Sequence, residues 1–176
     1  MNNLVVVFTL FLIFSVSAQT GGWNPELKDR ADEALSNMLE ESPKLEMFKS
    51  KAYAYVIFPK VTKAGIGIGG AAGRGIVYQN GKAIGSSKLK QASIGLQLGG
   101  QQYSEAIFFK DKEAFEKFTN GNLKFDAQAS AVAITEGASA DLSYSGGVAV
   151  FTHTKGGLMY EASIGGQHFT YESLKN

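Results

Sequence analysis

The sequence predicts an α+β protein that is mainly antiparallel β, with two N-terminal helices and one short internal helix. Apolar residues recur at helical spacing before residue 52, and their period changes to two after it. Short turns join the strand-like segments without crossover helices, which is typical of antiparallel sheets. About ten strands that are rich in glycine favour a strongly bent sandwich or a partly closed barrel.

Residues 1–18 have the pattern of a signal peptide. An apolar run over residues 4–14 ends in small residues, and Val16 and Ala18 suit the −3 and −1 positions of cleavage before Gln19. The run is shorter than the roughly 20 apolar residues of a membrane-spanning helix, although retention as an uncleaved anchor is the alternative. We therefore expect an exported protein, periplasmic or extracellular, that is peripheral to a membrane.

The next segment, residues 19–52, is expected to be helical and to pack on the domain. Asn24 and the proline after it suit the cap and first residue of a helix that runs to about Glu41. Pro43 begins a second, shorter helix that ends near Lys51. The rest of the chain, residues 53–176, forms the glycine-rich β domain.

Within the β domain, turn signals separate short segments of alternating residues. Asn80 and Gly81 predict a tight hairpin turn. Asp111 is expected to cap a short helix that ends at Asn120 and Gly121. Strands are expected at 53–58, 64–70, 73–79, 82–86, 92–99, 103–109, 124–135, 138–145, 147–154, 157–164 and 167–172.

The glycines around residue 67 set one stretch apart. Gly65, Gly67 and Gly69 alternate with isoleucines, so one face of a strand there carries no side chains. A glycine face of this kind marks a bulge, a sharp bend or the close approach of another group. The spacing also contains a formal GxGxxG, but a strand follows where a dinucleotide site needs a helix. We expect no nucleotide and no other cofactor.

Catalytic and metal-binding patterns are weak. His153 and His168 are the two histidines, and Ser143 and Asp141 allow a hydrolytic triad only on paper. Neither a nucleophile elbow nor an oxyanion loop accompanies them. The chain has no cysteine, which excludes thiolate ligands and disulfides. The sequence therefore predicts a protein that is not an enzyme, with no catalytic residues and no metal site.

Charge is the most informative feature. From Met47 to Ser104 there is no Asp or Glu, while eight Lys and Arg residues occur. A long field of one sign predicts an anionic partner. Anionic lipid and nucleic acid would both be attracted, but an exported protein rarely meets nucleic acid and no aromatic-basic RNA motif is present.

Three strings resemble the SYLF-domain family over about residues 30–172. They are AYVIFPKVTKAGIGIGGAAGRGIV, IGLQLGGQQYSEAIFFKDKEAFEKF and GGVAVFTHTKGGLMYEASIGG. The resemblance implies a lipid-binding module, because relatives in fungi and animals bind phosphoinositides and some bind actin. Actin is not an expected partner of an exported chain. In the animal branch a basic N-terminal helix carries membrane binding, whereas residues 19–46 of this chain are acidic.

These observations lead to one functional expectation. The protein binds anionic phospholipid at an envelope membrane surface, without catalysis, through the basic glycine-rich region. The alternatives are a structural protein that binds another envelope protein, and a carrier of an acyl chain. The expected lipid-binding residues are Lys49, Lys51, Lys60, Lys63 and Arg74.

Overall fold

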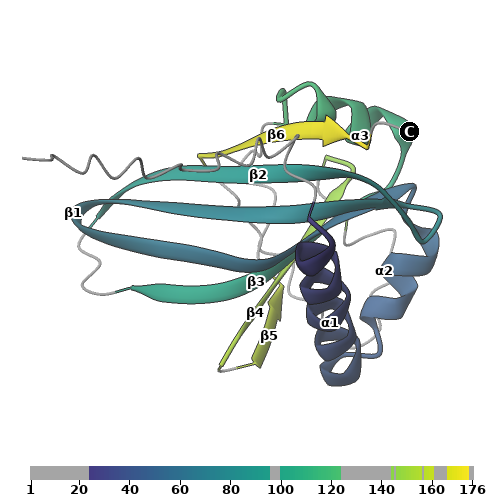
Figure 1. The fold of residues 1–176 in the computed structure, drawn as a ribbon, viewed down its shortest axis with the longest axis horizontal. Coiled ribbons are helices and arrows are strands. Elements are labelled where there is room, and N and C mark those ends of the chain that lie inside the picture. The colour runs from purple at the N-terminus through teal and green to yellow at the C-terminus, as the bar shows by residue number, and fades with distance from the viewer. Residues whose placement is uncertain are drawn as a thin grey trace, which may run out of the picture.

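The computed structural model describes residues 24–95, 100–123, 144, 146–155, 157–160 and 166–174. The expected signal peptide, the strand expected at 124–135 and all but residue 144 of that expected at 138–145 lie outside the described residues. The described chain forms three helices and one antiparallel sheet with strand order β5-β4-β3-β1-β2-β6 (Figure 1). The elements are α1 (Pro25–Glu41), α2 (Leu45–Lys51), β1 (Ala54–Gln79), β2 (Lys82–Gly95), β3 (Gln101–Phe109), α3 (Lys112–Thr119), β4 (Val148–Thr154), β5 (Gly157–Tyr160) and β6 (Gln167–Ser173).

The three helices confirm the two N-terminal helices and the internal helix. The Asn24 side chain accepts a hydrogen bond from the Glu26 N–H at 2.8 Å, which caps α1 as expected. Helix α2 begins at Leu45, two residues later than predicted, because Pro43 belongs to a turn. The Asp111 carboxylate caps α3 by accepting from the Ala114 N–H at 2.9 Å. No helix in the described part of the chain is long and apolar enough to cross a membrane.

The prediction of about ten separate strands was wrong, because it placed breaks where the strands continue. The residues between the predicted strands, 59–63, 71–72 and 87–91, stay extended instead. The predicted turn at Asn80 and Gly81 is confirmed, with φ angles of 51° and 72°. The segments 53–58, 64–70 and 73–79 form the single strand β1, and 82–86 and the described part of 92–99 form β2.

Strand β1 bends back on itself, so that its two halves lie side by side (Figure 1). The rings of Tyr55 and Tyr78 stack across the halves with centroids 5.0 Å apart. A Cβ at Gly73 would lie 3.0 Å from Val61 Cγ2 on the other half. The first half pairs with β3 and the second with β2, so β1 occupies the middle of the sheet.

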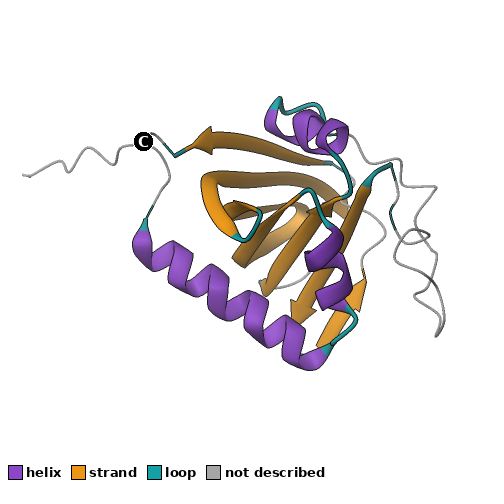
Figure 2. Ribbon diagram, turned by 90° about the vertical axis from the view of Figure 1, so that its right-hand side faces the viewer, coloured by secondary structure: helices purple, strands orange, loops and turns teal. Residues whose placement is uncertain are grey.

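Alternating side chains give the sheet two buried faces. One face packs against α1 and α2, and the opposite face packs against α3 (Figure 2). On β1, for example, Tyr55 and Ile57 face the N-terminal helices, while Val56 and Phe58 face α3. Period-two alternation thus places apolar side chains on both sides, as expected for a covered sheet.

The sheet is strongly curled but not closed. Strand β6 lies at one edge, next to β2, yet its Gln167 Nε2 donates to Glu105 Oε2 of β3 at 3.1 Å. The Phe169 ring of β6 likewise lies 5.9 Å from Phe58 of β1. The expectation of a sandwich is therefore corrected to a single curled sheet within the described residues. Among the described strands, the edge strands β5 and β6 do not pair, so this sheet is not closed into a barrel.

Candidate functional site

Two basic residues lie directly opposite each other on neighbouring strands. Arg74 of β1 is in register with Lys88 of β2. Arg74 is two residues before Ile76, which packs against the N-terminal helices, so both project from that face. Arg74 is nevertheless exposed, so α1 and α2 leave this end of the face uncovered. Like charges at directly opposed positions destabilise a sheet.

Two further lysines join this pair on the same face. Because a Cβ at Gly73 would contact the Val61 side chain, positions 73 and 61 share a face. Their neighbours Arg74 and Lys60 therefore share the other one. Lys90 alternates with Lys88 and is exposed. We call the following four residues the basic surface: Lys60, Arg74, Lys88 and Lys90.

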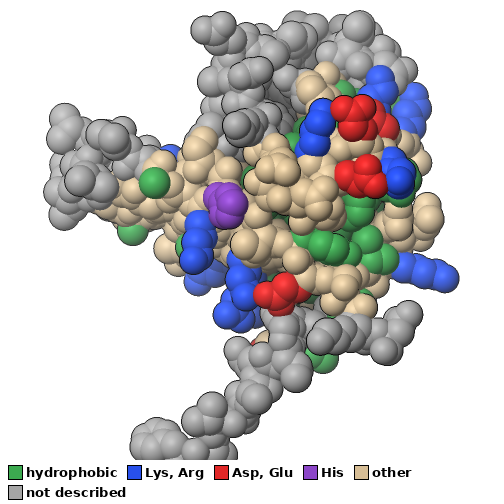
Figure 3. Space-filling model, turned by 90° about the horizontal axis from the view of Figure 1, so that it is seen from above, with side chains coloured by type: hydrophobic (Ala, Val, Ile, Leu, Met, Phe, Trp, Pro, Cys, Tyr) green, Lys and Arg blue, Asp and Glu red, His purple; other side chains and the backbone are tan. Residues whose placement is uncertain are grey.

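The charge of the basic surface is only partly compensated. Lys88 Nζ lies 3.0 Å from Glu172 Oε1 of β6 in a half-exposed ion pair. Within the described residues, Lys60, Arg74 and Lys90 pair with no carboxylate. His168 is exposed in register with Lys90. Lysine and arginine side chains gather beside a histidine on the face seen in Figure 3.

The other expected lipid-binding residues lie elsewhere. Lys49 and Lys51 are on α2, and Lys51 lies just before the end of β1 that pairs with Phe109. Lys49 lies 3.3 Å from Glu46 in an ion pair. Lys63 is in register with Gln101 and lies on the opposite face from Lys60. The structure thus brings together Lys60 and Arg74 from the five expected residues.

The histidines are not arranged for catalysis. His153 Nε2 lies 2.8 Å from Glu41 Oε2, which ties the end of α1 to β4. His168 lies on β6, at the other edge of the sheet. Ser143 and Asp141, the other members of the hypothetical hydrolytic triad, lie outside the described residues. Among the residues that the structure does describe, no three His, Asp or Glu side chains form a metal-binding group.

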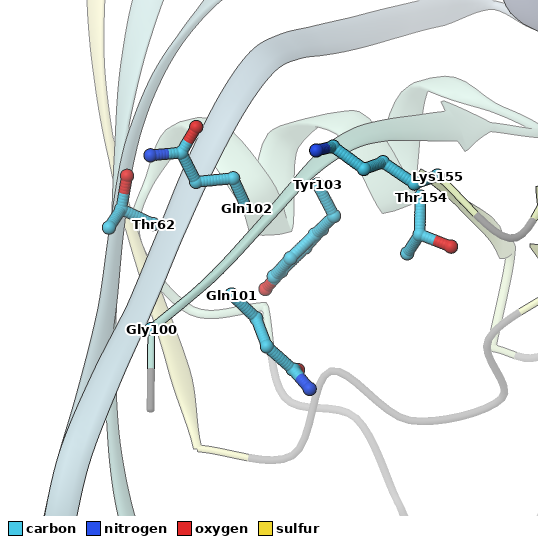
Figure 4. A pocket seen from close by; sticks show the side chains of 7 residues that line it. All are labelled: Thr62, Gly100, Gln101, Gln102, Tyr103, Thr154 and Lys155. Atoms are coloured by element: carbon cyan, nitrogen blue, oxygen red, sulfur yellow. The ribbon is translucent and has the colours of Figure 1, made fainter. Parts of the chain in front are cut away.

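A hollow of about 670 Å³ lies beside the first half of β1, the start of β3 and the end of β4. Its walls come from the first half of β1, the start of β3 and the turn after β4, as Figure 4 shows. It is lined by Thr62, Gly100, Gln101, Gln102, Tyr103, Thr154 and Lys155. Sequence reasoning missed this hollow, because it joins three segments that lie far apart in the chain.

The described residues thus form a curled sheet that has helices on both faces and one exposed basic end. Residues 90–176 match the family model Ysc84, described as Las17-binding protein actin regulator. A curated relative, beta cell expansion factor A from Aeromonas veronii, is 29% identical over 141 residues. The match covers 79% of this chain and 53% of that relative, so the chain spans about half the relative's length. Both similarities are to the SYLF-domain family: the family model matches just under half of the chain, and the relative is a SYLF-family protein.

Proposed function

We propose that this protein binds anionic phospholipid at a membrane surface through the basic surface, without catalysing a reaction. The observation that carries the proposal is the direct opposition of Arg74 and Lys88, flanked by Lys60 and Lys90. The positive charges of Arg74 and Lys88 repel each other in the isolated protein. Their proximity becomes favourable when an anionic surface supplies negative charge. Lipid binding is also known in the SYLF-domain family.

The basic surface suits a membrane better than a buried ligand. Its residues lie on adjacent strands of one sheet, so the charges are spread over an exposed face rather than around a cavity. A Lys or Arg close to an anionic bilayer contributes roughly 1 kcal/mol of binding free energy. Four such residues would supply binding of useful strength while remaining sensitive to salt.

The proposal also includes the cellular location of the protein and a role for the other expected lipid-binding residues. Export through the signal peptide would bring the protein to an envelope membrane, where anionic lipid is accessible. Lys49, Lys51 and Lys63 would then add weaker, longer-range attraction, because they lie away from the basic surface. Their contribution is expected to be smaller per residue than that of Lys60 or Arg74.

Vesicle co-sedimentation tests the proposal. Lys60→Gln combined with Arg74→Gln should weaken binding to phosphatidylglycerol vesicles about tenfold or more, since two charges of roughly 1 kcal/mol each exceed one decade. Binding of the unmodified protein should also fade as added salt shortens the Debye length. Neutral phosphatidylcholine vesicles should bind much less of either protein.

The matched control removes the same charge from the opposite side of the sheet. Lys112→Gln with Lys117→Gln alters two exposed residues of α3 that pair with Glu116 and Glu113. This pair should change vesicle binding far less. An equal loss in both double variants would mean that net charge, not the basic surface, controls binding. If neither variant nor salt has an effect, the lipid proposal fails and a protein partner in the envelope becomes the better explanation.

A further inference from the structure

Helix α1 carries an acidic surface on the side that faces away from the sheet. The helix contains six acidic and two basic residues, and its buried side is apolar. Glu26, Asp29, Glu33 and Glu40 follow one another at helical spacing, so they line one side of the helix. All four are exposed, and within the described residues none of them forms an ion pair. We call these four residues the acidic surface.

The acidic surface and the basic surface lie on the same side of the sheet. Helix α1 packs on the sheet face that carries Ile76 and Tyr78, and Arg74 and Lys88 project from this face beyond the helix. Strands β1 and β2 extend past α1 at this end (Figure 1). The face is therefore stepped, because α1 stands above the exposed part of the sheet by one helix diameter, about 10 Å.

Two copies of such a stepped face are complementary to each other. When a second copy is placed face to face with the first by a two-fold rotation, the α1 helix of each copy lies over the basic surface of the other. The same contact then forms twice and closes the assembly. Each contact brings an acidic surface onto a basic surface, and charge complementarity of this kind favours one orientation of the partners over others.

We propose that the protein forms a two-fold dimer in which the acidic surface of each copy covers the basic surface of the other. Anionic lipid competes for the same basic surface, so membrane binding separates the copies. This competition rests on the proposed lipid binding, whereas the dimer itself does not. The contacts join exposed charges, so the dimer is weak and sensitive to salt.

Sedimentation velocity of the full chain at several protein concentrations tests the dimer. The unmodified protein should shift from monomer to dimer as its concentration rises. A roughly tenfold increase in salt, which shortens the Debye length about threefold, should reverse this shift. Two double variants, Glu33→Lys with Glu40→Lys and Lys60→Glu with Arg74→Glu, should each weaken self-association about tenfold or more, because like charges then face each other.

A charge-swap experiment identifies the contact. An equimolar mixture of the two double variants should form dimers under conditions in which neither variant does so alone. The mixed dimer pairs the new lysines with the new glutamates in one contact and keeps the original pairing in the other. Glu113→Lys with Glu116→Lys reverses two exposed carboxylates of α3, on the opposite side of the sheet, and is the matched control. This control variant should dimerise like the unmodified protein.

Vesicle binding separates this proposal from lipid binding. Glu33→Lys with Glu40→Lys leaves the basic surface intact, so this variant should bind phosphatidylglycerol vesicles at least as tightly as the unmodified protein. Vesicle binding by a protein that stays monomeric at low salt overturns the dimer alone. A dimer that the mixture restores, without vesicle binding, supports the dimer and overturns only the competition with lipid. A dimer that neither double variant weakens, or an assembly that keeps growing with concentration, overturns the two-fold contact.

Discussion

Single residues show how contacts distant in the chain hold the helices on the sheet. The Tyr78 hydroxyl of β1 donates to Asp32 Oδ1 of α1 at 2.6 Å, and its ring stacks on Tyr55. Burial raises the pKa of the Tyr78 hydroxyl well above its usual value, and the hydrogen bond with Asp32 raises it further. The neutral phenol is therefore the form that stabilises the fold.

The raised pKa of Tyr78 predicts that the protein loses stability at high pH. A raised folded-state pKa means that the contribution of Tyr78 is complete below the unfolded pKa of about 10 and declines as the pH rises above it. Tyr78→Phe should cost roughly 1.5 kcal/mol at pH 7, because it removes a hydrogen bond to a carboxylate. Urea unfolding at several pH values measures this difference. The difference should shrink above pH 10, and a constant difference would contradict the assignment.

At the scale of elements, β1 decides the shape of the sheet. Its fold-back requires the two halves to approach closely, and glycine makes that possible at Gly75. A Cβ there would lie 2.7 Å from both the Ile57 carbonyl oxygen and Phe58 Cδ1. Close packing against a glycine is thus found at Gly75, which was not among the glycines that the sequence pattern singled out. Side chains around Gly67, where the expectation was formed, lie outside those that the structure describes.

Gly75→Ala should therefore destabilise the protein by roughly 1–3 kcal/mol, because the backbone carbonyl cannot move aside easily. Gly100→Ala is the matched control, since its nearest neighbour is the Lys63 carbonyl oxygen at 3.9 Å. That variant should be neutral or slightly stabilising, because alanine restricts the unfolded chain. Chemical denaturation midpoints compare the two. Equal midpoints would show that the halves of β1 separate more readily than the structure indicates.

At the scale of the whole molecule, the charges of individual segments determine where a charged partner can bind, whereas the net charge of +1 does not. The acidic helix α1 and the shorter α2 cover one end of the face that carries the basic surface. A single sheet face thus has a buried part under α1 and α2 and an exposed, positively charged part beyond them. This division concentrates uncompensated positive charge where a partner can reach it.

Multivalent anions should therefore stabilise the folded protein. An anion that binds the native state but not the unfolded state raises stability by RT ln(1 + [L]/Kd). Inositol hexakisphosphate should raise the melting temperature of the unmodified protein more than that of Lys60→Gln with Arg74→Gln. Without the anion, the same double variant should be as stable as the unmodified protein or more so, because cross-strand repulsion is relieved. Equal anion-induced shifts in both proteins would place the anion elsewhere.

The sequence alone determined those features that depend on neighbours in the chain. Caps at Asn24 and Asp111, the Asn80–Gly81 turn and the bounds of α1 follow from local hydrogen bonding and backbone preference. The α+β class, the resemblance to the SYLF-domain family and the positive charge of residues 47–104 could also be predicted from the sequence. The continuity of β1 and β2 could not, because residues 59–63, 71–72 and 87–91 are kept extended by strands that lie far away in the chain.

Only the tertiary structure determined which charged residues lie next to each other in the basic surface. Extending the register from the hairpin pair Gln79 and Lys82 would set Arg74 opposite Ser87, but a β-bulge after Val77 shifts it to Lys88. A shift of one residue turns every later side chain of a strand to the other face. The fold-back of β1 then adds Lys60 to this face and leaves Lys63 on the other. The basic surface thus depends on a register and a bend that no local pattern in the chain specifies.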